Sequence, residues 1–565
     1  LENTVKLYDT IEEFDLDMKN AKYPKLFDDN IQAIKGKVKE GYANRGLDKL
    51  PKGEQELYQR QILEELNVMQ KTGSIDYMLL EQYVKESMGK EGRYAGFARG
   101  SSGGSVIAWL LNITDINPLK HELLFERFMN KDRISLADID SDWTNQDRER
   151  VQQFLLTHDK LDCAAVITYG TFGVKSAINA IGRGMGYDDK EISSITVALP
   201  NNADFEDVPR SAFEKYPDLM ERAKMIKGVV TSVGRHASAI LVSDLNLEEY
   251  IGTTMVKGFD YPVTTINMEL VEKMKMVKLD VLGLSTLGWS HEAIKLASIP
   301  RIHSQSEHID WNDWSIRDDI LDNSTLTIFQ LEEQEHAIQK IMSDESLARI
   351  RETSPDITVI DLISITTAVI RPGSASIMSD VLNGISRDYG IPEIDEILSD
   401  SFGHVIYQEQ TINLIKYAGF SGSQADIIRR AIGHKDAEVI NNWIPEFKET
   451  LVNKIMSDYP TKDKEEVIET VDGLAQIIID SSAYSFNKSH AVAYSYISYE
   501  TAWLRKYYPL EWLTAGFIIW RNSLDKVNTL TRLADKLNIS INPVKFRYSR
   551  GDYFMDTDNN DIYEG

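Results

Sequence analysis

Three aspartates at alternate positions limit the local structure and the chemistry of this chain more than any other segment does. The segment 133–143 reads RISLADIDSDW, so that Asp138, Asp140 and Asp142 are two residues apart. On an extended strand all three carboxylates lie on one face, with successive ones roughly 6.5–7 Å apart. Their repulsion costs up to about 1 kcal/mol for each close pair, and divalent Mg²⁺ or Mn²⁺ would remove that cost. The spacing allows two interpretations, a metal site and a solvated acidic turn, whereas an EF-hand loop lacks its required Gly and Glu.

A second acidic position occurs in the segment 277–284, VKLDVLGL, which has the composition of a strand. Asp280 lies there among Val and Leu residues, and burial of its carboxylate is costly unless it is paired or bound to a metal. Lys278 shares the same face of this strand, because successive side chains alternate between the two faces. A surface ion pair between Lys278 and Asp280 is therefore the alternative interpretation.

A loop rich in glycine and serine precedes both acidic segments. Residues 99–105 read RGSSGGS and are followed directly by VIAWLLN, which predicts a buried apolar helix. Small residues allow the backbone to approach a ligand, and free amides at the helix start, together with serine hydroxyls and Arg99, predict an anion site. The segment lacks the GK[ST] ending of a P-loop and the Rossmann glycine spacing. A flexible linker remains the alternative.

Composition limits the class of protein. The chain has 565 residues, 42% of them hydrophobic, which predicts three or four folded domains. The sequence contains no run of apolar residues long enough for a membrane span, and we expect no membrane partner. The single Cys163, predicted to be a small buried hydrophobe, and the lack of a secretory leader indicate the cytoplasm. The net charge of −26 does not exclude nucleic acid, because a basic groove can lie on an acidic body.

The order of patterns along the chain predicts an α+β fold. The first 80 residues have helical spacing, and strand patterns occur at 238–243 and 276–281. Residues 170–230 contain three prolines and predict a small helical insertion within the sheet. Amphipathic helical patterns dominate from about residue 300 onward. Because the chain begins with Leu1 rather than Met, we expect it to be a fragment of a longer protein.

Ten motifs extend this pattern over nearly the whole chain. They are GFARGSSGGS (96–105), NITDINPLKHELLFERFMNKDRISLADIDSDW (112–143), ITYGTFGVKSAI (167–178), GRHASAILVS (234–243), VKLDVLGLSTL (277–287), IFQLE (328–332), IRPG (370–373), VIYQEQ (405–410), ADIIRRAIGHK (425–435) and SFNKSHAVAYSYISYETAWLRKYYP (485–509). In this order they resemble the alpha subunit of bacterial replicative DNA polymerase III, the family C polymerases. The sequence departs from the usual family pattern at Ala137, Trp143 and Ser374, and the loop opens with GFARG. None of these changes removes a charged residue of the motifs.

The resemblance implies a nucleotidyltransferase-like palm with a mixed sheet, a helical thumb insertion and large, mainly helical fingers. The implied divisions are a linker remnant (1–20), the first part of the palm (21–172), the thumb (173–229), the second part of the palm (230–292) and the fingers (293–565). The implied function is a template-directed DNA polymerase core that adds deoxynucleotides to a primer 3′ end by two-metal-ion phosphoryl transfer and releases pyrophosphate. Two other functions stay open: a catalytically silent nucleic-acid-binding relative or scaffold of the replication complex, and a nucleotidyltransferase of another substrate class.

The resemblance also assigns site residues. It implies that Asp138, Asp140 and Asp280 are catalytic and hold two Mg²⁺ ions, with Mn²⁺ as the alternative metal and Asp142 as an additional ligand. The residues implied to bind the nucleotide are Arg99, Gly100, Ser101, Gly104, Ser105, Arg127, Arg133, Lys278, Arg429, Arg430, Lys435, Asn487, Lys488, Ser489 and His490. The implied partners are primer–template DNA and deoxynucleoside triphosphates, with other replication proteins bound through regions absent from this chain.

For several of these residues a purely structural role is the alternative. Arg429 and Arg430 fit a solvated helix face, and Lys488 and His490 fit hydrogen bonding within a loop. The aromatic residues near the last motif are expected to belong to the core more often than to stack on bases; they are Tyr484, Phe486, Tyr494 and Tyr499.

Overall fold

A computed structural model gives the fold of the chain, and it describes residues 2–11, 17–132, 138–371, 374–481, 484–547 and 549–565. The chain divides into two compact units. The first unit contains Leu1–Pro24 and Gln152–Leu279, and the second contains Lys25–Val151 and Asp280–Gly565. The division falls within two elements, the helix α7 (Asn145–Leu156) and the strand β6 (Lys278–Gly283).

The first unit contains a mixed sheet. Its strands are β2 (Asp162–Thr171), β3 (Val230–Ser243), β4 (Thr253–Thr254) and β5 (Val263–Asn267). Strand β2 pairs antiparallel with β3 and parallel with β5, and β4 pairs antiparallel with β5. The middle of β2 is buried because it reads CAAVI, a run of small and β-branched residues that packs on both faces.

A group of helices lies between β2 and β3 along the chain and has its own core. These helices are α8 (Val174–Gly184), α9 (Asp189–Thr196), α10 (Arg210–Lys215) and α11 (Pro217–Ile226), with a 3-10 turn at Phe205–Asp207. Their apolar faces bury Ile178, Ile192 and Leu219 in one cluster. The predicted helical insertion at 170–230 is thereby confirmed. The unit also contains α1 (Glu2–Tyr8), α12 (Leu247–Tyr250) and α13 (Met268–Lys273).

In the second unit, strand β1 (Asp140–Trp143) pairs in parallel with the last four residues of β6. The register places Asp140 opposite Asp280 and Trp143 opposite Gly283. Two acidic residues that are 140 positions apart in the sequence therefore become direct neighbours across one strand pair, where adjacent strands lie about 4.8 Å apart.

In the described part of the second unit, five helices precede β1 along the chain. They are α2 (Asn30–Asn44), α3 (Lys52–Thr72), α4 (Ile75–Lys90), α5 (Val106–Leu110) and α6 (Phe125–Phe128), with 3-10 turns at η1 (Leu47–Lys49) and η2 (Gly100–Gly104). Helix α4 is the most deeply buried of the longer ones, because its run from Ile75 to Gln82 is covered on all sides. Helices α2 and α3 both pack against α5.

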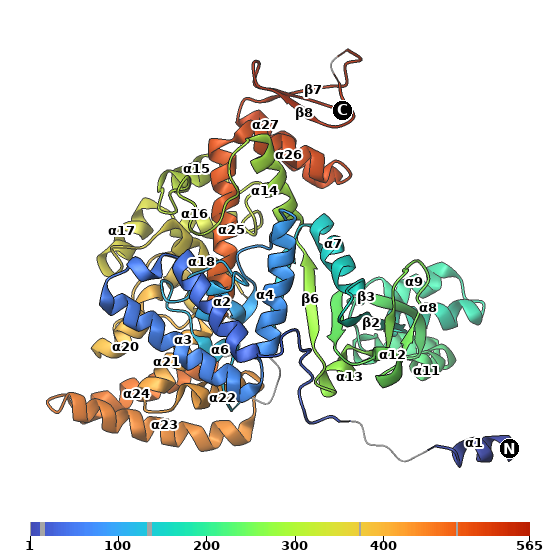
Figure 1. The fold of residues 1–565 in the computed structure, drawn as a ribbon, viewed down its shortest axis with the longest axis horizontal. Helices are drawn as coiled ribbons and strands as arrows, with labels where there is room; N and C mark the ends of the chain where they lie inside the picture. The colour runs from blue at the N-terminus through green and yellow to red at the C-terminus, as the bar shows by residue number, and fades with distance from the viewer. Residues whose placement is uncertain (1, 12–16, 133–137, 372–373, 482–483, 548) are drawn as a thin grey trace. The chain divides into compact units, whose positions relative to one another are not determined.

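The C-terminal part of the second unit is mainly helical (Figure 1). Its helices are α14 (Ser285–Leu296), α15 (Ser315–Asn323), α16 (Glu335–Ile341), α17 (Asp344–Thr353), α18 (Val359–Val369), α19 (Ala375–Leu382), α20 (Pro392–Ile397), α21 (Gln408–Tyr417), α22 (Gly422–Gly433), α23 (Ala437–Asp458), α24 (Lys464–Ser481), α25 (Lys488–Tyr507), α26 (Pro509–Trp520) and α27 (Leu524–Lys536). A 3-10 turn lies at Ser399–Ser401, and a small sheet is formed by β7 (Ser540–Asn542), β9 (Asp561–Tyr563) and β8 (Phe554–Asp556).

Helix α25 forms the centre of this part. It packs against α15, α18 and α26 (Figure 1). Most of its residues are buried. Its first turn also contacts the η2 turn, which brings the segment at 488–494 to the glycine-rich loop.

The α+β class and the mixed sheet predicted from the sequence are confirmed, as is the helical character after residue 300. The predicted divisions into palm, thumb and fingers stay predictions. Cys163 is buried, as expected, and burial raises the pKa of its thiol to about 12. Of the helices within the described ranges, none combines the length and the apolar character needed to cross a bilayer.

Candidate functional site

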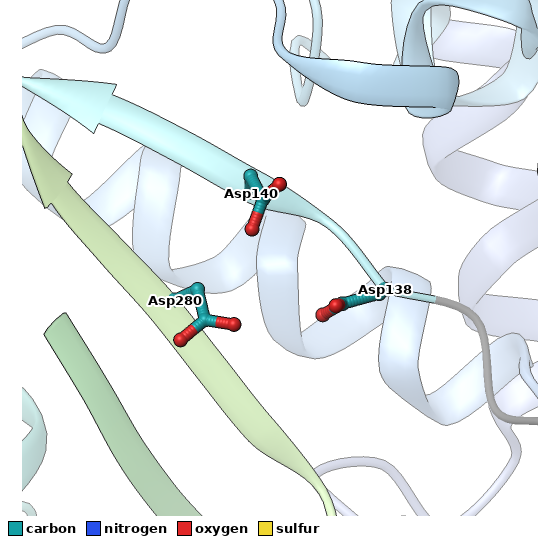
Figure 2. Close-up of side chains that lie close together, drawn as sticks. All are labelled: Asp138, Asp140 and Asp280. Atoms are coloured by element: carbon teal, nitrogen blue, oxygen red, sulfur yellow. The ribbon is translucent and has the colours of Figure 1, made fainter. Parts of the chain in front are cut away.

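Three carboxylates converge at the start of β1. Asp140 opens β1, Asp280 lies opposite it on β6, and Asp138 lies two residues before the strand. One oxygen from each side chain lies within 4.8 Å of the others. Figure 2 shows that the three side chains point into a shared space. The two strands thus bring together the acids that the sequence singled out in separate segments.

The donor set of this carboxylate group fits a hard divalent cation. It offers oxygen atoms alone, which suit Mg²⁺ or Mn²⁺, and no nitrogen or sulfur ligand of the kind that structural zinc sites use. Asp138 is exposed and the other two are half-buried, so that an ion has access from solvent. Three like charges this close repel one another, and a cation would offset that repulsion.

Asp142, the third acid of the alternating motif, lies outside the carboxylate group in the part of the chain that the structure describes. Its side chain is buried and accepts two hydrogen bonds. Arg99 Nη1 donates to Asp142 Oδ1 at 3.0 Å, and Tyr494 Oη donates to Asp142 Oδ2 at 2.8 Å. Its carboxylate is therefore already bound by a cation and a hydroxyl, and its role as a metal ligand stays a prediction.

Helix α4 contacts the backbone between Asp138 and Asp140 through Tyr77. The hydroxyl of Tyr77 accepts a hydrogen bond from the Ile139 amide at 2.9 Å, and both groups are buried. This bond fixes the residue between Asp138 and Asp140. Tyr77 was not predictable from the sequence, because nothing in the apolar run of α4 distinguishes a tyrosine that bonds to backbone from one that only packs.

Glu81 and Lys85, one turn apart on α4, are a second feature that the sequence analysis missed. Burial raises the pKa of Glu81 to about 7 against the opposing effect of Lys85, and the negative charges of the carboxylate group act in the same direction as burial. Burial also lowers the pKa of Lys85, whose Nζ donates to the Ile113 carbonyl at 2.8 Å. The sequence signal for this pair is an acid and a base four residues apart in the largely apolar segment YMLLEQYVK (77–85).

The glycine-rich loop differs from the expectation in one respect. Its helix does not begin with free amides, because the buried carboxylate of Glu65 from α3 accepts hydrogen bonds from the Val106 and Ile107 amides at 2.9 and 3.0 Å. Ser105 donates its hydroxyl to the same carboxylate at 2.7 Å and accepts from the Ala108 amide. The first amides of α5 are therefore not free to bind a ligand, because the Glu65 carboxyl group already accepts from them. Ser105 is fully buried as the N-cap of α5 and does not reach the surface.

The remaining loop residues lie in η2, beside the start of α25. The Gly100 amide donates to His490 Nδ1 at 3.1 Å, and Gly100 and Ser101 are half-buried. Gly104 has no room for a side chain, since an added Cβ would lie 2.6 Å from the Leu124 carbonyl oxygen. The loop therefore presents Arg99, Gly100 and Ser101, while its second half is packed into the fold.

The NKSH segment at 487–490 serves mainly to start α25. Asn487 is the N-cap, accepts from the His490 amide at 2.9 Å and donates to the buried Glu409 at 2.8 Å. Lys488 Nζ lies 2.7 Å from Asp400 Oδ2, and Ser489 is fully buried. These contacts support the structural alternative for Asn487, Lys488 and Ser489.

His490 and Tyr494 share one face of α25 and face Arg99. The two rings lie 4.1 Å apart between centroids. Burial lowers the pKa of His490 to about 4, with the charges of Arg99 and Arg371 acting in the same direction, so the imidazole is neutral near pH 7. Tyr494 is buried, as expected of a core residue, but its hydroxyl contacts Arg99 and Asp142, and no sequence pattern indicated that contact.

Three arginines gather around one buried acid. Arg429 Nη2 and Arg430 Nε lie 2.9 and 2.8 Å from the two oxygens of Asp426, which is fully buried. Arg127 Nε donates to Gln408 at 2.8 Å, and burial lowers the pKa of Arg127 to about 10, with Arg429 and Arg430 acting in the same direction. Arg127 also lies near the buried Glu409, and the three arginines outnumber the two acids, so this cluster keeps positive charge.

Three further predicted residues have other positions. Lys435 is exposed just after α22. Lys278 is the first residue of β6 and belongs to the first unit. Arg133 lies outside the described residues, so its predicted role is neither supported nor opposed.

Comparison with known proteins places these motifs in a family context. The model of the bacterial DNA polymerase III alpha NTPase domain matches residues 32–283, and the model of the bacterial DNA polymerase III alpha subunit finger domain matches residues 284–455. The chain is 30% identical over 521 residues to DNA polymerase III subunit alpha of Ureaplasma parvum, covering 89% of this chain and 51% of that protein. It is 29% identical over 563 residues to the Helicobacter pylori protein of the same name, covering 93% and 44%. The chain thus spans about half the length of the curated relatives it matches.

Proposed function

Because the chain belongs to the bacterial DNA polymerase III alpha subunit family, we propose that it is the core of a template-directed DNA polymerase. The proposed reaction adds a deoxynucleotide to a primer 3′ end with the release of pyrophosphate. The proposed substrates are primer–template DNA and deoxynucleoside triphosphates. Two Mg²⁺ ions are the proposed cofactors, with Mn²⁺ as the alternative.

The convergence of Asp138, Asp140 and Asp280 carries this proposal. Their oxygens lie within 4.8 Å of one another although they come from two distant segments. A scaffold without catalytic function has no need for such a group, since the repulsion it creates only weakens the fold. The donor set matches the metal that phosphoryl-transfer enzymes use.

Asp138, Asp140 and Asp280 would hold the metal ions. When bound, the ions would lower the pKa of the primer 3′-hydroxyl and neutralise charge on the leaving pyrophosphate. The chain's own residues provide the other functions. Arg99 places a guanidinium beside Asp140, with Nε 3.7 Å from Asp140 Oδ2. A cation in this position stabilises the negative oxygens of a triphosphate.

His490 would orient the glycine-rich loop at Gly100 rather than transfer a proton. Its pKa of about 4 keeps the ring neutral, and Nδ1 accepts from the Gly100 amide, so the ring proton lies on Nε2. A neutral imidazole in this position fixes the backbone at Gly100. Positive charge for the phosphates then comes from Arg99 and from the cluster of Arg127, Arg429 and Arg430.

Primer extension tests the proposal. We expect the unmodified chain to extend a labelled primer with all four deoxynucleotides and Mg²⁺, and EDTA to stop the reaction. Asp140→Asn and Asp280→Asn should each lower the rate by about 10²- to 10³-fold or more, because each removes one metal-binding charge. Asp318→Asn is the matched control, since Asp318 is a surface acid of α15 paired with Arg317, and it should retain full activity.

The outcomes separate the alternatives. No incorporation by the unmodified chain, with DNA binding intact, would favour a silent relative or scaffold. Addition without a template would favour a nucleotidyltransferase of another class. Extension that is equally fast in Asp280→Asn would contradict the assignment of the carboxylate group.

A further inference from the structure

Arg99 makes three contacts that together fix its guanidinium at the edge of the carboxylate group. Nη1 donates to Asp142 Oδ1 at 3.0 Å and to Tyr494 Oη at 2.6 Å. Nε lies 3.7 Å from Asp140 Oδ2, which is close enough for attraction but too far for a hydrogen bond. Arg99 is therefore held by hydrogen bonds to the buried Asp142 and Tyr494, and it only approaches Asp140, a candidate metal ligand.

Asp142 and Tyr494, which are both buried, also bond to each other. Tyr494 Oη donates to Asp142 Oδ2 at 2.8 Å while accepting from Arg99, so the three groups form a closed triangle of hydrogen bonds. Burial raises the pKa of Tyr494, and Asp142 acts in the same direction, so the phenol keeps the proton it donates. The tyrosine ring is packed between Phe329 and His490, with centroids 5.3 and 4.1 Å away.

The position of the Arg99 guanidinium decides which of two carboxylates its positive charge binds. Arg99 has two carboxylates within reach, Asp140 and Asp142, and a cation on Asp140 competes with any metal ion for the same oxygens. While Asp142 and Tyr494 hold Nη1, the guanidinium stays short of a direct hydrogen bond to Asp140. Without them, Asp140 is the carboxylate partner left to Arg99 among its described contacts.

The geometry points to Asp142 and Tyr494 as a clamp that positions Arg99 toward the triphosphate and prevents it from competing with a metal ion for the Asp140 oxygens. This inference rests on the proposed function and deepens it. It gives Asp142 a role as the anchor of a guanidinium in place of a metal ligand. Tyr494 is a positioning residue, because it acts through Arg99.

Metal binding without turnover is the direct test. Mn²⁺ binding to the unmodified chain is measured by electron paramagnetic resonance, with no DNA or nucleotide present. We expect Tyr494→Phe to weaken Mn²⁺ binding about 5- to 10-fold, the size of effect that one lost hydrogen bond produces. Asp142→Asn should weaken it at least as much, because Arg99 then loses a charged partner. In primer extension, Tyr494→Phe should raise the KM for the deoxynucleotide more than it lowers kcat.

The double variant distinguishes a clamp from a structural role. In an Arg99→Gln background there is no guanidinium to release, so Tyr494→Phe should leave Mn²⁺ affinity unchanged. Tyr499→Phe is the matched control, since Tyr499 is another buried, hydrogen-bonded tyrosine of α25 that donates to the Asp310 carbonyl at 2.6 Å. It should bind Mn²⁺ like the unmodified chain.

Equal Mn²⁺ affinity in Tyr494→Phe and the unmodified chain would overturn the clamp, as would an equal loss in the Arg99→Gln background. If either occurs while the unmodified chain still extends primers, the clamp fails and the proposed polymerase stands. If the unmodified chain neither binds Mn²⁺ nor extends primers, both fail. Asp142→Asn provides an independent measurement should Tyr494→Phe not fold.

Discussion

The buried carboxyl group of Glu65 makes the helix start that follows the glycine-rich loop sensitive to pH. Burial raises the pKa of Glu65 from 4.5 to about 7, although its hydrogen bonds with Ser105, Ile107, Val106 and Gln61 oppose that change. In the unfolded chain this carboxyl loses its proton near pH 4.5, whereas in the folded chain it keeps the proton until about pH 7. The folded state therefore binds more protons in this window, and stability is full below pH 4.5 and falls as the pH rises to 7.

The difference between the two pKa values gives the magnitude. At 1.36 kcal/mol for each pH unit, it corresponds to about 3 kcal/mol of stability lost between pH 4.5 and 7. Glu65→Gln cannot ionise, so the variant should not show this loss. Glu64→Gln is the control, because Glu64 is the exposed neighbour on the same helix and should keep the pH dependence of the unmodified chain.

Local hydrogen exchange is the appropriate assay, because a chain of two units does not unfold in one two-state step. Peptides that cover residues 100–111 report the opening of η2 and α5, where the Glu65 hydrogen bonds end. After correction for the intrinsic exchange rate, the opening free energy of the unmodified chain should fall with pH relative to Glu65→Gln. The same pH dependence in both proteins would refute the reasoning.

Three further predictions follow from the structure. Tyr77→Phe leaves the buried Ile139 amide without its acceptor and should lower kcat about 10-fold with DNA affinity unchanged, as measured by single-turnover extension and fluorescence anisotropy; full activity would contradict it. Gly104→Ala forces a Cβ against the Leu124 carbonyl and should lower the local opening free energy of η2 by about 1–3 kcal/mol in hydrogen exchange. Gly473→Ala in α24 meets open space and should raise the opening free energy of α24 by about 0.5–1 kcal/mol; the reverse order would be inconsistent with the packing. Binding of primer–template DNA should weaken more than 10-fold between 50 and about 200 mM salt, and a binding curve insensitive to salt would argue against a phosphate-contacting groove.

The sequence predicted the fold class and singled out the three acids that the structure brings together, because both depend on local patterns. Alternating aspartates and the VKLDVLGL strand identified the acids, and the proline-punctuated segment at 170–230 identified the helical insertion. What joins Asp138 and Asp140 to Asp280 is the parallel pairing of β1 with β6, and this pairing is set by tertiary packing over 140 residues. Local patterns contain no information on that register, so the distance between the acids was not predictable from spacing alone.

Contacts between distant polar residues were the least predictable part. The glycine-rich segment before α5 predicted amides free for an anion, but these amides donate to the carboxyl group of Glu65, 41 residues before Val106. Tyr494 had the spacing of a core residue, and it is buried, yet its hydroxyl also bonds Asp142. Helical spacing predicts which side chains are buried, and it does not predict which buried polar atoms meet.

Anomalous diffraction from crystals of the chain soaked in Mn²⁺ tests the central claim most directly. We expect Mn²⁺ peaks coordinated by carboxylate oxygens of Asp138, Asp140 and Asp280, and loss of the peaks in Asp280→Asn crystals. Carboxylates that stay without Mn²⁺ at saturating concentration, or peaks that persist unchanged in Asp280→Asn, would contradict it.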